Sequence, residues 1–448
     1  MSKVYKLRKG LTIPLKGEAE RIVHQLPLPK TVAIKPTDFI GVVPKLVVKE
    51  GDTVLAGDVL FIDKNNQSIQ FTSPVSGVVQ TILRGERRKL LEVVVAVDSE
   101  ISYKKFEIPT DITNREAIID FMLQSGVWPF VKQRPFNCIA KPTDIPKAIH
   151  VSAFDTAPLA PDYPFVISEY KELFQKGLQI LNALTPGKLH LNILEENRTL
   201  HPFDECCGDV QKNYFSGIHP AGNVGVQIHH IDPINKGDVV WTLNPQDVVI
   251  IARLFEKGIF DAHKTIAVTG NLQKPHYVKT ILGAAVNDCF EEQIVENQRI
   301  ISGNVLTGTN VGYKGYIGFY DSQITVIPEG NKPEFMGWIA PGFEKFSLSR
   351  TFFSWLQIGK KYTIDTNLHG GERAFVFTGV YEKVLPMDIY PMQLLKAIIV
   401  NDIDKMEQLG IYEVVEEDFA LCEFVCPSKI EIQSIIRQGL TVIQKEFS

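Results

Sequence analysis

Six cysteines are the side chains best suited to hold a metal ion or an iron–sulfur cluster. The segment Cys422-Glu-Phe-Val-Cys426-Pro427 matches the end of the ferredoxin pattern C-x₂-C-x₂-C-x₃-C-P, whose thiolates bind iron. Phe419 stands where a preceding cysteine is expected, and a cluster needs four thiolates. We therefore expect Cys422 and Cys426 to be buried structural residues. The alternative is a cluster completed by Cys206 and Cys207.

A second group of metal-binding side chains gathers in one stretch of thirty residues, 201–230. Their spacing matches no familiar zinc pattern, so we expect a polar loop that packs onto a sheet. The glycines between Ser216 and Gly225 indicate a backbone that comes close to another chain or to a ligand. The side chains in question are His201, Cys206, Cys207, His219, His229 and His230.

Phosphate-binding and nucleophile motifs are missing from the sequence. No G-x-G-x-x-G follows a predicted strand and no G-x-x-x-x-G-K-S/T is present, so a nucleotide would lack a glycine-rich cradle. The first α/β loop, Ser125–Phe136, instead carries Trp128, Phe130 and two prolines, which crowd such a cradle. The glycines from Gly308 to Gly315 are typical of turns. No G-x-S-x-G occurs either.

The elements that position these residues begin with a small β-sandwich over residues 41–100. Lys49-Glu-Gly-Asp-Thr-Val-Leu-Ala-Gly-Asp-Val-Leu-Phe61 and Ser73-Pro-Val-Ser-Gly-Val-Val79 predict two turns of the fold that carries lipoyl or biotinyl groups. Gly51 and Gly57 stand where tight turns need a positive φ. The nearest candidate for a modified lysine, Lys64, stands two residues too early. We expect a carrier fold reused as a structural module.

Strands and helices then alternate over residues 101–260, which favours a mainly parallel α/β sheet. Thr113-Asn-Arg-Glu116 predicts a capping box, and the helix behind it stops at Gly126. Asn244-Pro245 predicts the start of a helix that runs to Glu256, with Gly258 beyond it. The other predicted elements are strands at 148–153, 189–194, 239–243 and 265–269, and a helix at 168–184.

After about residue 275, glycines punctuate short β segments, and we expect a small β-rich domain over residues 261–330. Tyr316–Tyr320 and Gln323–Ile327 predict a hairpin across Asp321-Ser322. The tail from Pro386 is largely helical, with helices predicted over residues 392–400, 402–409 and 429–447. The domain limits expected are an N-terminal segment 1–40, the β-sandwich 41–100, the α/β domain 101–260, the β-rich domain 261–330 and a C-terminal, largely helical domain 331–448.

Bulk properties exclude several classes of function. The chain has 448 residues, 44% hydrophobic and 22% charged, which is ordinary for a soluble multidomain protein. A net charge of −5 gives no case for nucleic acid, and no apolar run is long enough to span a bilayer. The N-terminus is basic without an apolar run behind it, so no secretory signal is expected. We expect a cytosolic protein, or one bound to a membrane through partners, with mostly reduced cysteines.

The basic turn Arg84–Lys89 is predicted to be solvated, and contact with anionic lipid headgroups is the alternative.

Seven motifs, spread in order over nearly the whole chain, resemble the NqrA family, a component of the bacterial Na⁺-translocating NADH:quinone oxidoreductases. That family is similar in fold to the C component of the Rnf complex and to the NADH-binding flavin protein of respiratory complex I. The motifs are Leu123–Trp128 with Lys132–Phe136, Ser152–Asp162, His219–Asn223 with Ile228–Pro233, Ile301–Gly308, Pro328–Gly330, Gly371–Arg373 and Ala420–Pro427.

The resemblance implies an α/β multidomain fold: a lipoyl-like barrel-sandwich, a Rossmann-like domain, a β-grasp of the soluble-ligand-binding (SLBB) type and a helical C-terminal domain. It implies a peripheral subunit on the cytoplasmic face of the bacterial inner membrane, in a complex of six different subunits. That complex oxidises NADH, reduces ubiquinone or menaquinone and exports Na⁺. Flavins and iron centres are expected in other subunits, so this chain is expected to bind no cofactor, hold no metal and have no catalytic residue of its own.

A quinone-contacting role is the site hypothesis that the resemblance adds. Aromatic and apolar side chains near the first α/β loop could accommodate a quinone ring, although a packed loop is the reading that we favour. Two other functions stay open: a carrier protein with a swinging arm on Lys64, and a stand-alone NADH dehydrogenase. The candidate quinone-contact residues are Trp128, Phe130, Arg134, Phe136 and His219.

Overall fold

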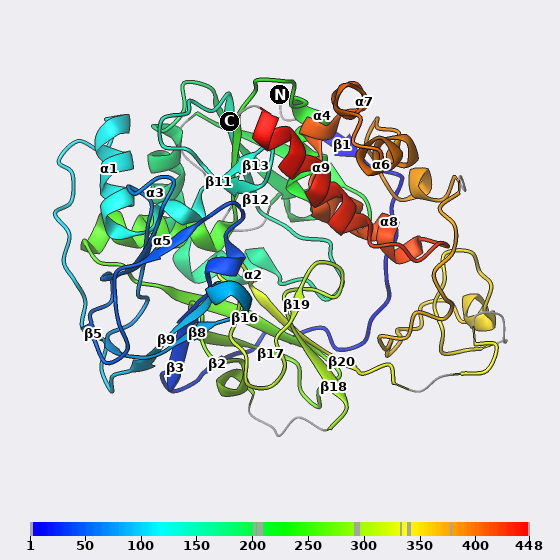
Figure 1. Ribbon diagram of the computed structural model, residues 1–448, viewed down its shortest axis with the longest axis horizontal. Coiled ribbons are helices and arrows are strands. Elements are labelled where there is room, and N and C mark those ends of the chain that lie inside the picture. Colours follow the sequence, from blue (N-terminus) through cyan, green and yellow to red (C-terminus); the bar gives the residue numbers. More distant parts are fainter. Residues whose placement is uncertain are drawn as a thin grey trace.

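A computed structural model describes residues 3–199, 203, 209–290, 296–331, 334–337, 342–376 and 379–446. Its strands form four sheets, and its longer helices cover the largest sheet and build the C-terminal end of the chain (Figure 1). Among the described residues, no helix is both long and apolar enough to cross a membrane. Cys138, Cys289, Cys422 and Cys426 are free thiols.

The largest sheet has seven strands in the order β1-β14-β13-β12-β15-β10-β11. The first five are parallel to their neighbours, and β10 and β11 are antiparallel at one edge, so the predicted mainly parallel sheet is confirmed. Its central strands are buried almost throughout, as expected where helices cover both faces, and they carry the buried polar residues His150, His190 and Asn192 among apolar ones. The strands are β1 (Val4–Lys6), β10 (Lys132–Arg134), β11 (Cys138–Ile139), β12 (Ala148–Ser152), β13 (Lys188–Leu194), β14 (Val210–Ser216) and β15 (Val240–Leu243).

The helices of this domain start and stop at residues with recognisable caps. Asn244 donates its backbone N–H to the Asp247 carboxylate, and Gly258 ends the helix with a φ of 64°, as predicted. The first helix differs: its N-cap is Asn114, whose side chain accepts the N–H groups of residues 116 and 117, so the capping box predicted from Thr113 is wrong by one residue. The helices are α1 (Arg115–Ser125), α2 (Tyr163–Ile167), α3 (Lys171–Asn182), α4 (Val224–Ile231) and α5 (Pro245–Lys257).

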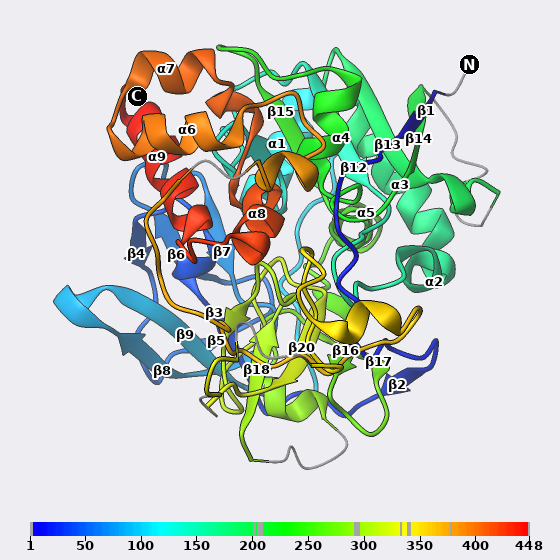
Figure 2. The ribbon, with the colours of Figure 1, turned by 90° about the vertical axis from the view of Figure 1, so that its right-hand side faces the viewer.

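The N-terminal sandwich consists of a four-stranded and a three-stranded sheet, β3-β9-β8-β5 and β4-β6-β7. Phe39, Phe61 and Phe71 pack at its centre, and Gly51 and Gly57 have the predicted positive φ. The hairpin of β8 and β9 projects from the body of the molecule (Figure 2). The strands are β3 (Thr31–Ile34), β4 (Pro44–Leu46), β5 (Thr53–Val54), β6 (Val59–Asp63), β7 (Gln70–Thr72), β8 (Gly77–Arg84) and β9 (Leu90–Val97).

A six-stranded sheet in the order β19-β18-β20-β16-β17-β2 forms the β-rich domain. The hairpin predicted across Asp321-Ser322 is wrong, because β20 pairs with β16 and β18. Residues 316–320 instead lie against distant segments: Ile317 donates its N–H to the Ala284 carbonyl. The strands are β2 (Val23–Gln25), β16 (His263–Gly270), β17 (His276–Ile281), β18 (Gln298–Ser302), β19 (Thr309–Asn310) and β20 (Gln323–Pro328).

The N-terminal segment and the C-terminal helices each contact more than one domain. Residues 1–40 supply one strand to each of three sheets: β1 to the α/β sheet, β2 to the β-rich sheet and β3 to the sandwich. The C-terminal helices pack on a second apolar core that also contains residues of α4 and of the N-terminal segment. Three of these helices lie close to those predicted: α6 (Pro391–Ile399), α7 (Ile403–Gln408) and α9 (Ile432–Glu446). The fourth, α8 (Ala420–Val425), was not predicted. The five domain limits stay predictions.

Candidate functional site

A crevice of about 400 Å³ opens at the carboxyl ends of β12 and β15. The strand order reverses here, because β13 continues the sheet on one side of β12 and β15 lies on the other. Loops after such neighbouring parallel strands diverge, which leaves a binding crevice at this point in α/β sheets generally. The crevice is also walled by residues 303–307 and 320–323 of the β-rich domain and by Glu416, Glu417 and Gln433 of the C-terminal helices.

His219, one of the five predicted site residues, lines this crevice. Its Nδ1 lies 3.1 Å from the Thr156 hydroxyl, which accepts the N–H of Gly222 at 2.8 Å. Burial lowers the pKa of His219 to about 4, so the ring is neutral at pH 7. The Thr156 hydroxyl can donate to Nδ1, and in that tautomer the ring proton is on Nε2. His219 is therefore a neutral N–H donor in a polar crevice.

Two glycines of the loop that carries His219 are required by close contacts with other segments. A Cβ on Gly222 would lie 2.5 Å from the Thr156 nitrogen and 2.8 Å from the Asp155 Cα, so only glycine allows the two loops to touch. Gly225 is equally confined, with Arg134 Nη1 2.3 Å and Asp418 Oδ2 2.5 Å from its virtual Cβ. The close approaches that the structure shows for Gly222 and Gly225 are to other segments of the same chain.

A buried polar network lies beneath the crevice. Gln227 donates to the Ser152 hydroxyl at 2.9 Å and accepts from Asn192 at 2.8 Å, and Asn192 in turn accepts from Asn213 at 3.0 Å. Burial raises the pKa of Asp155, which lines the crevice and accepts the Ala157 N–H at 2.8 Å. The sequence reasoning missed these residues as site candidates, although Ser152 and Asp155 lie in a motif that carried the family resemblance.

The other four predicted residues lie behind the crevice or in the core. Trp128 and Phe130 are fully buried; the Trp128 ring packs edge-on against Trp241 and its Nε1–H donates to the Ala140 carbonyl at 2.7 Å. Arg134 Nη1 bonds the buried Asp418 carboxylate at 2.9 Å, and its Nη2 forms an ion pair with Glu417 on the crevice wall. Phe136 is partly buried against the C-terminal core and accepts a hydrogen bond from Arg437 through its carbonyl.

Backbone N–H groups of the first α/β loop are already hydrogen-bonded to nearby carbonyls. The N–H groups of residues 126, 127, 130 and 131 all donate to carbonyls of residues 122, 123, 127 and 128. A phosphate cradle needs several such amides free and convergent. The apolar side chains of the loop fill the core between the sandwich and the α/β domain, as the sequence predicted.

The remaining chemistry-bearing residues have local roles. His229 bridges the Glu413 carboxylate at 2.7 Å and the Asp388 N–H at 3.0 Å, and the His230 ring bonds the Val226 carbonyl. No group of three or more metal-binding side chains occurs among the described residues, and His201, Cys206 and Cys207 lie outside them. Cys422 and Cys426 are buried, as expected. Lys64 is exposed directly after β6, and its N–H bonds the Val43 carbonyl.

Comparison with known proteins identifies the family. Three family models match: the NqrA N-terminal barrel-sandwich hybrid domain over residues 5–98, the NqrA second alpha/beta domain over residues 113–260 and the NQRA C-terminal (SLBB) domain over residues 265–312. The NqrA protein of the Na(+)-translocating NADH-quinone reductase of Neisseria meningitidis strain Z2491 is 40% identical over 98% of this chain and 99% of its own length. The chain belongs to the NqrA family.

Other NqrA relatives match over the same extent. Those of Rhodopirellula baltica and Psychromonas ingrahamii are 39% and 38% identical, each over at least 98% of both chains. An NAD⁺-reducing NiFe hydrogenase superposes with a TM-score of 0.41 over 76% of this chain and 63% of that chain, at 12% identity. Membership of the NqrA family confirms the resemblance read from the motifs, and with it the barrel-sandwich, α/β and SLBB domain set.

Proposed function

We propose that this chain is a peripheral subunit of a six-subunit complex on the cytoplasmic face of a bacterial inner membrane. The complex oxidises NADH, reduces quinone and exports Na⁺, and the isolated chain is not catalytic. The observation that carries the proposal is the 40% identity over 98% of the chain to the NqrA protein of such a reductase. In this role the chain is a scaffold, and NADH, flavins and iron centres are held by other subunits.

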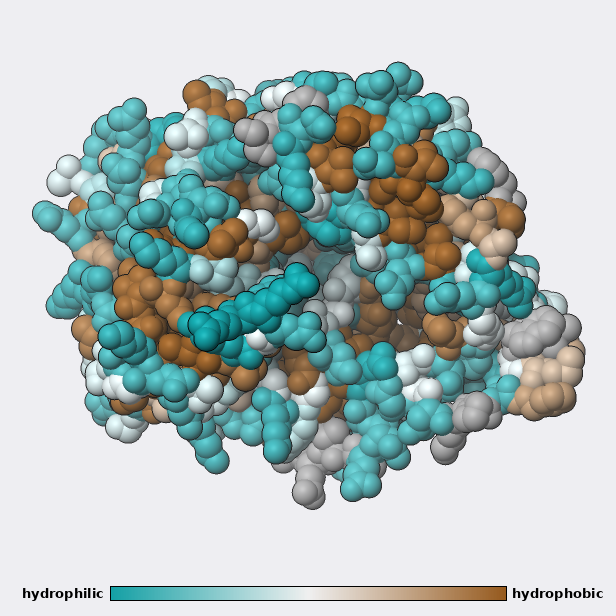
Figure 3. Space-filling model, viewed as in Figure 1, coloured by the Kyte–Doolittle hydropathy of each residue, from teal (hydrophilic) through white to brown (hydrophobic). Residues whose placement is uncertain are grey.

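Two features support a scaffold role. One is a loop unsuited to cradle a flavin phosphate, and the other is an apolar surface suited to contact with other proteins. The loop that would cradle phosphates bonds its amides internally and buries Trp128 and Phe130. In addition, hydrophobic side chains gather on one face over the C-terminal helices and over strands of the sandwich (Figure 3). Exposed apolar patches of this kind are typical of surfaces that contact other proteins.

The assembly is tested by purification from native membranes. The tagged chain, solubilised gently, should be recovered with integral-membrane flavoprotein subunits and with Na⁺-stimulated NADH:quinone activity. The purified chain alone should be colourless and have the mass of its sequence. Recovery alone in the soluble fraction, or a flavin spectrum on the isolated chain, would contradict the proposal, and a mass increment on Lys64 would favour the carrier function.

The crevice is the proposed place of quinone contact on this chain. A quinone carbonyl is a hydrogen-bond acceptor, and His219 offers a neutral N–H donor there. Arg134 and Phe136 lie behind the wall of the crevice. Arg134 pairs with Glu417, which lines the crevice, and Phe136 precedes Asn137, which also lines it. Contact with Trp128 or Phe130 would require the first α/β loop to leave the core, so the proposal rests on His219.

Quinone titration of the whole complex tests this contact. His219→Gln should raise the KM for quinone, while reduction of an artificial electron acceptor by NADH stays unchanged. His263→Gln is the matched control, because His263 lies outside the crevice and pairs with Asp261. An unchanged quinone KM in the His219 variant would remove the crevice from the quinone pathway without affecting the assignment of the chain to the complex.

A further inference from the structure

A second, larger cavity lies between Glu334 and residues 344–373 on one side and the turn that follows α8 on the other. Its volume is about 890 Å³, and it shares no lining residue with the crevice at the sheet. The resemblance motif Gly371–Arg373 and the end of the motif Ala420–Pro427 contribute to its wall. Neither motif has a role in the proposed function. We call this space the C-terminal cavity.

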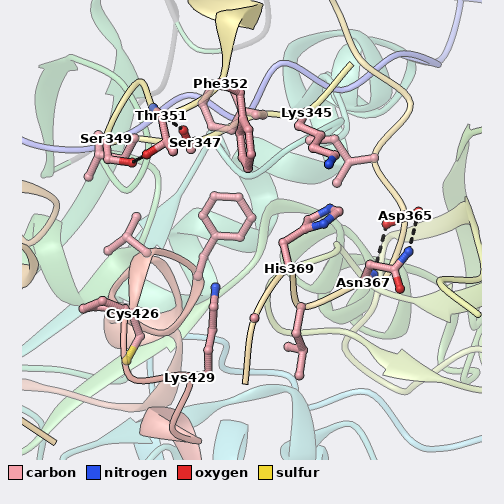
Figure 4. Close-up of a pocket in the computed structure, with 18 of the residues that line it drawn as sticks. Lys345, Ser347, Ser349, Thr351, Phe352, Asp365, Asn367, His369, Cys426 and Lys429 are labelled. Atoms are coloured by element: carbon pink, nitrogen blue, oxygen red, sulfur yellow. Dashed lines mark hydrogen bonds between the residues drawn. The ribbon is translucent and has the colours of Figure 1, made fainter. Parts of the chain in front are cut away.

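Basic side chains point into the C-terminal cavity from opposite sides. Figure 4 shows the Lys429 amino group rising from the C-terminal turn, with Lys345 and His369 facing it across the space. Lys345 is neutralised by Glu334 and donates to the Gly337 carbonyl at 3.0 Å. The Lys429 ammonium has no hydrogen-bond or ion-pair partner within the described part of the chain. It is half-buried, and an anion beside it would replace the water that it has lost.

Aromatic rings form the other part of the wall. The Phe352 ring reaches into the cavity, 5.4 Å from Lys345 Nζ and 6.3 Å from the His369 ring centre. Phe346 and Phe424 also line the cavity and stack with 6.4 Å between their ring centres. Flat apolar faces next to a few polar groups are typical of pockets that bind a planar organic ligand.

Hydrogen-bond donors suited to an anion complete the site. The hydroxyls of Ser347, Ser349 and Thr351 lie together at one end of the cavity, with 2.6 Å between those of Ser349 and Thr351. Gly370 and Gly371 also line the cavity, and a virtual Cβ on either residue meets no atom within 4 Å. Hydroxyls and accessible backbone N–H groups are common ligands of phosphate and carboxylate groups.

We propose that the C-terminal cavity binds an organic anion that carries both a phosphate or carboxylate group and a flat ring. The anion lies against Lys429, and the ring lies against Phe352 and His369. Cavities of about 300–1,000 Å³ hold ligands of this size, whereas a bare phosphate would fill a small part of the space. An uncharged quinone would leave the Lys429 ammonium unpaired, so this site and the proposed quinone contact select different ligands.

Equilibrium binding to the full-length chain tests the proposal, with AMP and 2-naphthoate as ring-bearing anions, adenosine as the ring alone and inorganic phosphate as the anion alone. AMP or 2-naphthoate should bind at one site per chain, and adenosine and phosphate should bind at least about tenfold more weakly than AMP. Lys429→Met should weaken the binding of the ring-bearing anion by about tenfold or more, because it removes the charge at nearly constant length. Lys64→Met, at an exposed lysine outside the cavity, should leave binding unchanged.

A second readout does not depend on the variant. The bound anion should protect Lys429, and not Lys64, from reductive methylation, as measured by mass spectrometry of peptides. Three results would overturn the proposal: no saturable binding of AMP or 2-naphthoate, adenosine binding as tightly as AMP, or wild-type affinity in Lys429→Met with no protection of Lys429.

Discussion

Replacement of Asp418 by asparagine should loosen the C-terminal helices far more than replacement of its neighbour Glu417 by glutamine. Both carboxylates pair with Arg134 of β10, but their surroundings differ. The side chains of Arg134 and Asp418 are 1% and 0% exposed, whereas that of Glu417 is 36% exposed. Asp418 also accepts the Val415 N–H at 3.0 Å, which asparagine can still do through its carbonyl oxygen.

The expected magnitudes follow from burial. Removal of one partner from a buried ion pair costs about 3–5 kcal/mol, because the remaining charge is left poorly compensated in the interior. Arg134 keeps Glu417 as a second partner, so the loss of Asp418 should lie toward the lower end of this range. The solvated pair with Glu417 contributes about 0–1 kcal/mol. Arg134 Nε and Asp418 Oδ1 have no hydrogen-bond partner within the described part of the chain, so the pair has no spare contact to take over the lost one.

Native-state hydrogen exchange of α8 and α9 measures the difference, because it reports local opening in a chain whose domains need not unfold together. At about 1.4 kcal/mol per tenfold change, Asp418→Asn should speed exchange by about 100-fold to several thousand-fold, and Glu417→Gln by about fivefold at most. The double variant Arg134→Met/Asp418→Asn should be less unstable than the sum of the single changes. Equal effects of the two single carboxylate variants would refute the argument from burial.

Three further predictions concern other contacts. Burial raises the pKa of Asp38 from 3.8 to about 6, so its contribution to stability is present below about pH 4 and lost as the pH rises through 6; Asp38→Asn should remove this loss in thermal unfolding measured between pH 4 and 7. Gly225→Ala should destabilise the chain by about 1–3 kcal/mol in urea titrations, because its Cβ would overlap the buried ion pair, while Gly371→Ala, in open space, should be nearly neutral. Trp128→Phe leaves the Ala140 carbonyl without its donor and should cost about 1–3 kcal/mol, whereas a solvent-facing tryptophan would show almost no loss.

The parts of the fold that the sequence predicted correctly are those defined by local signals. The strands β12, β13, β15 and β16 follow buried apolar runs, and α5 begins and ends at caps that can be recognised in the sequence. Such signals depend on neighbours a few residues away. Even the erroneous capping box at Thr113 marks the right helix, because Asn114 can supply the same side-chain acceptor.

The parts that could not be predicted depend on distant partners. The alternation of residues 316–320 predicted a hairpin strand, but the N–H groups of Ile317 and Phe319 bond the Ala284 carbonyl and the Asp38 carboxylate instead of β20. Likewise, β1 and β2 are three-residue strands that pair with β14 and β17, which lie far away in the sequence. No local pattern specifies such partners.

The same distinction applies to the two sites. A crevice at the ends of β12 and β15 follows from strand order, so any chain with this topology has one, whatever it binds. Its chemistry comes from three separate segments: the loop with Thr156, the loop with His219 and the turn with Glu417. The C-terminal cavity has no such topological cause, since its wall joins an irregular segment to the turn after α8. Lys429, which has no ion-pair partner among the residues that the structure describes, faces aromatic rings in a space that the fold does not require, and the binding of ring-bearing anions decides whether this space is a ligand site.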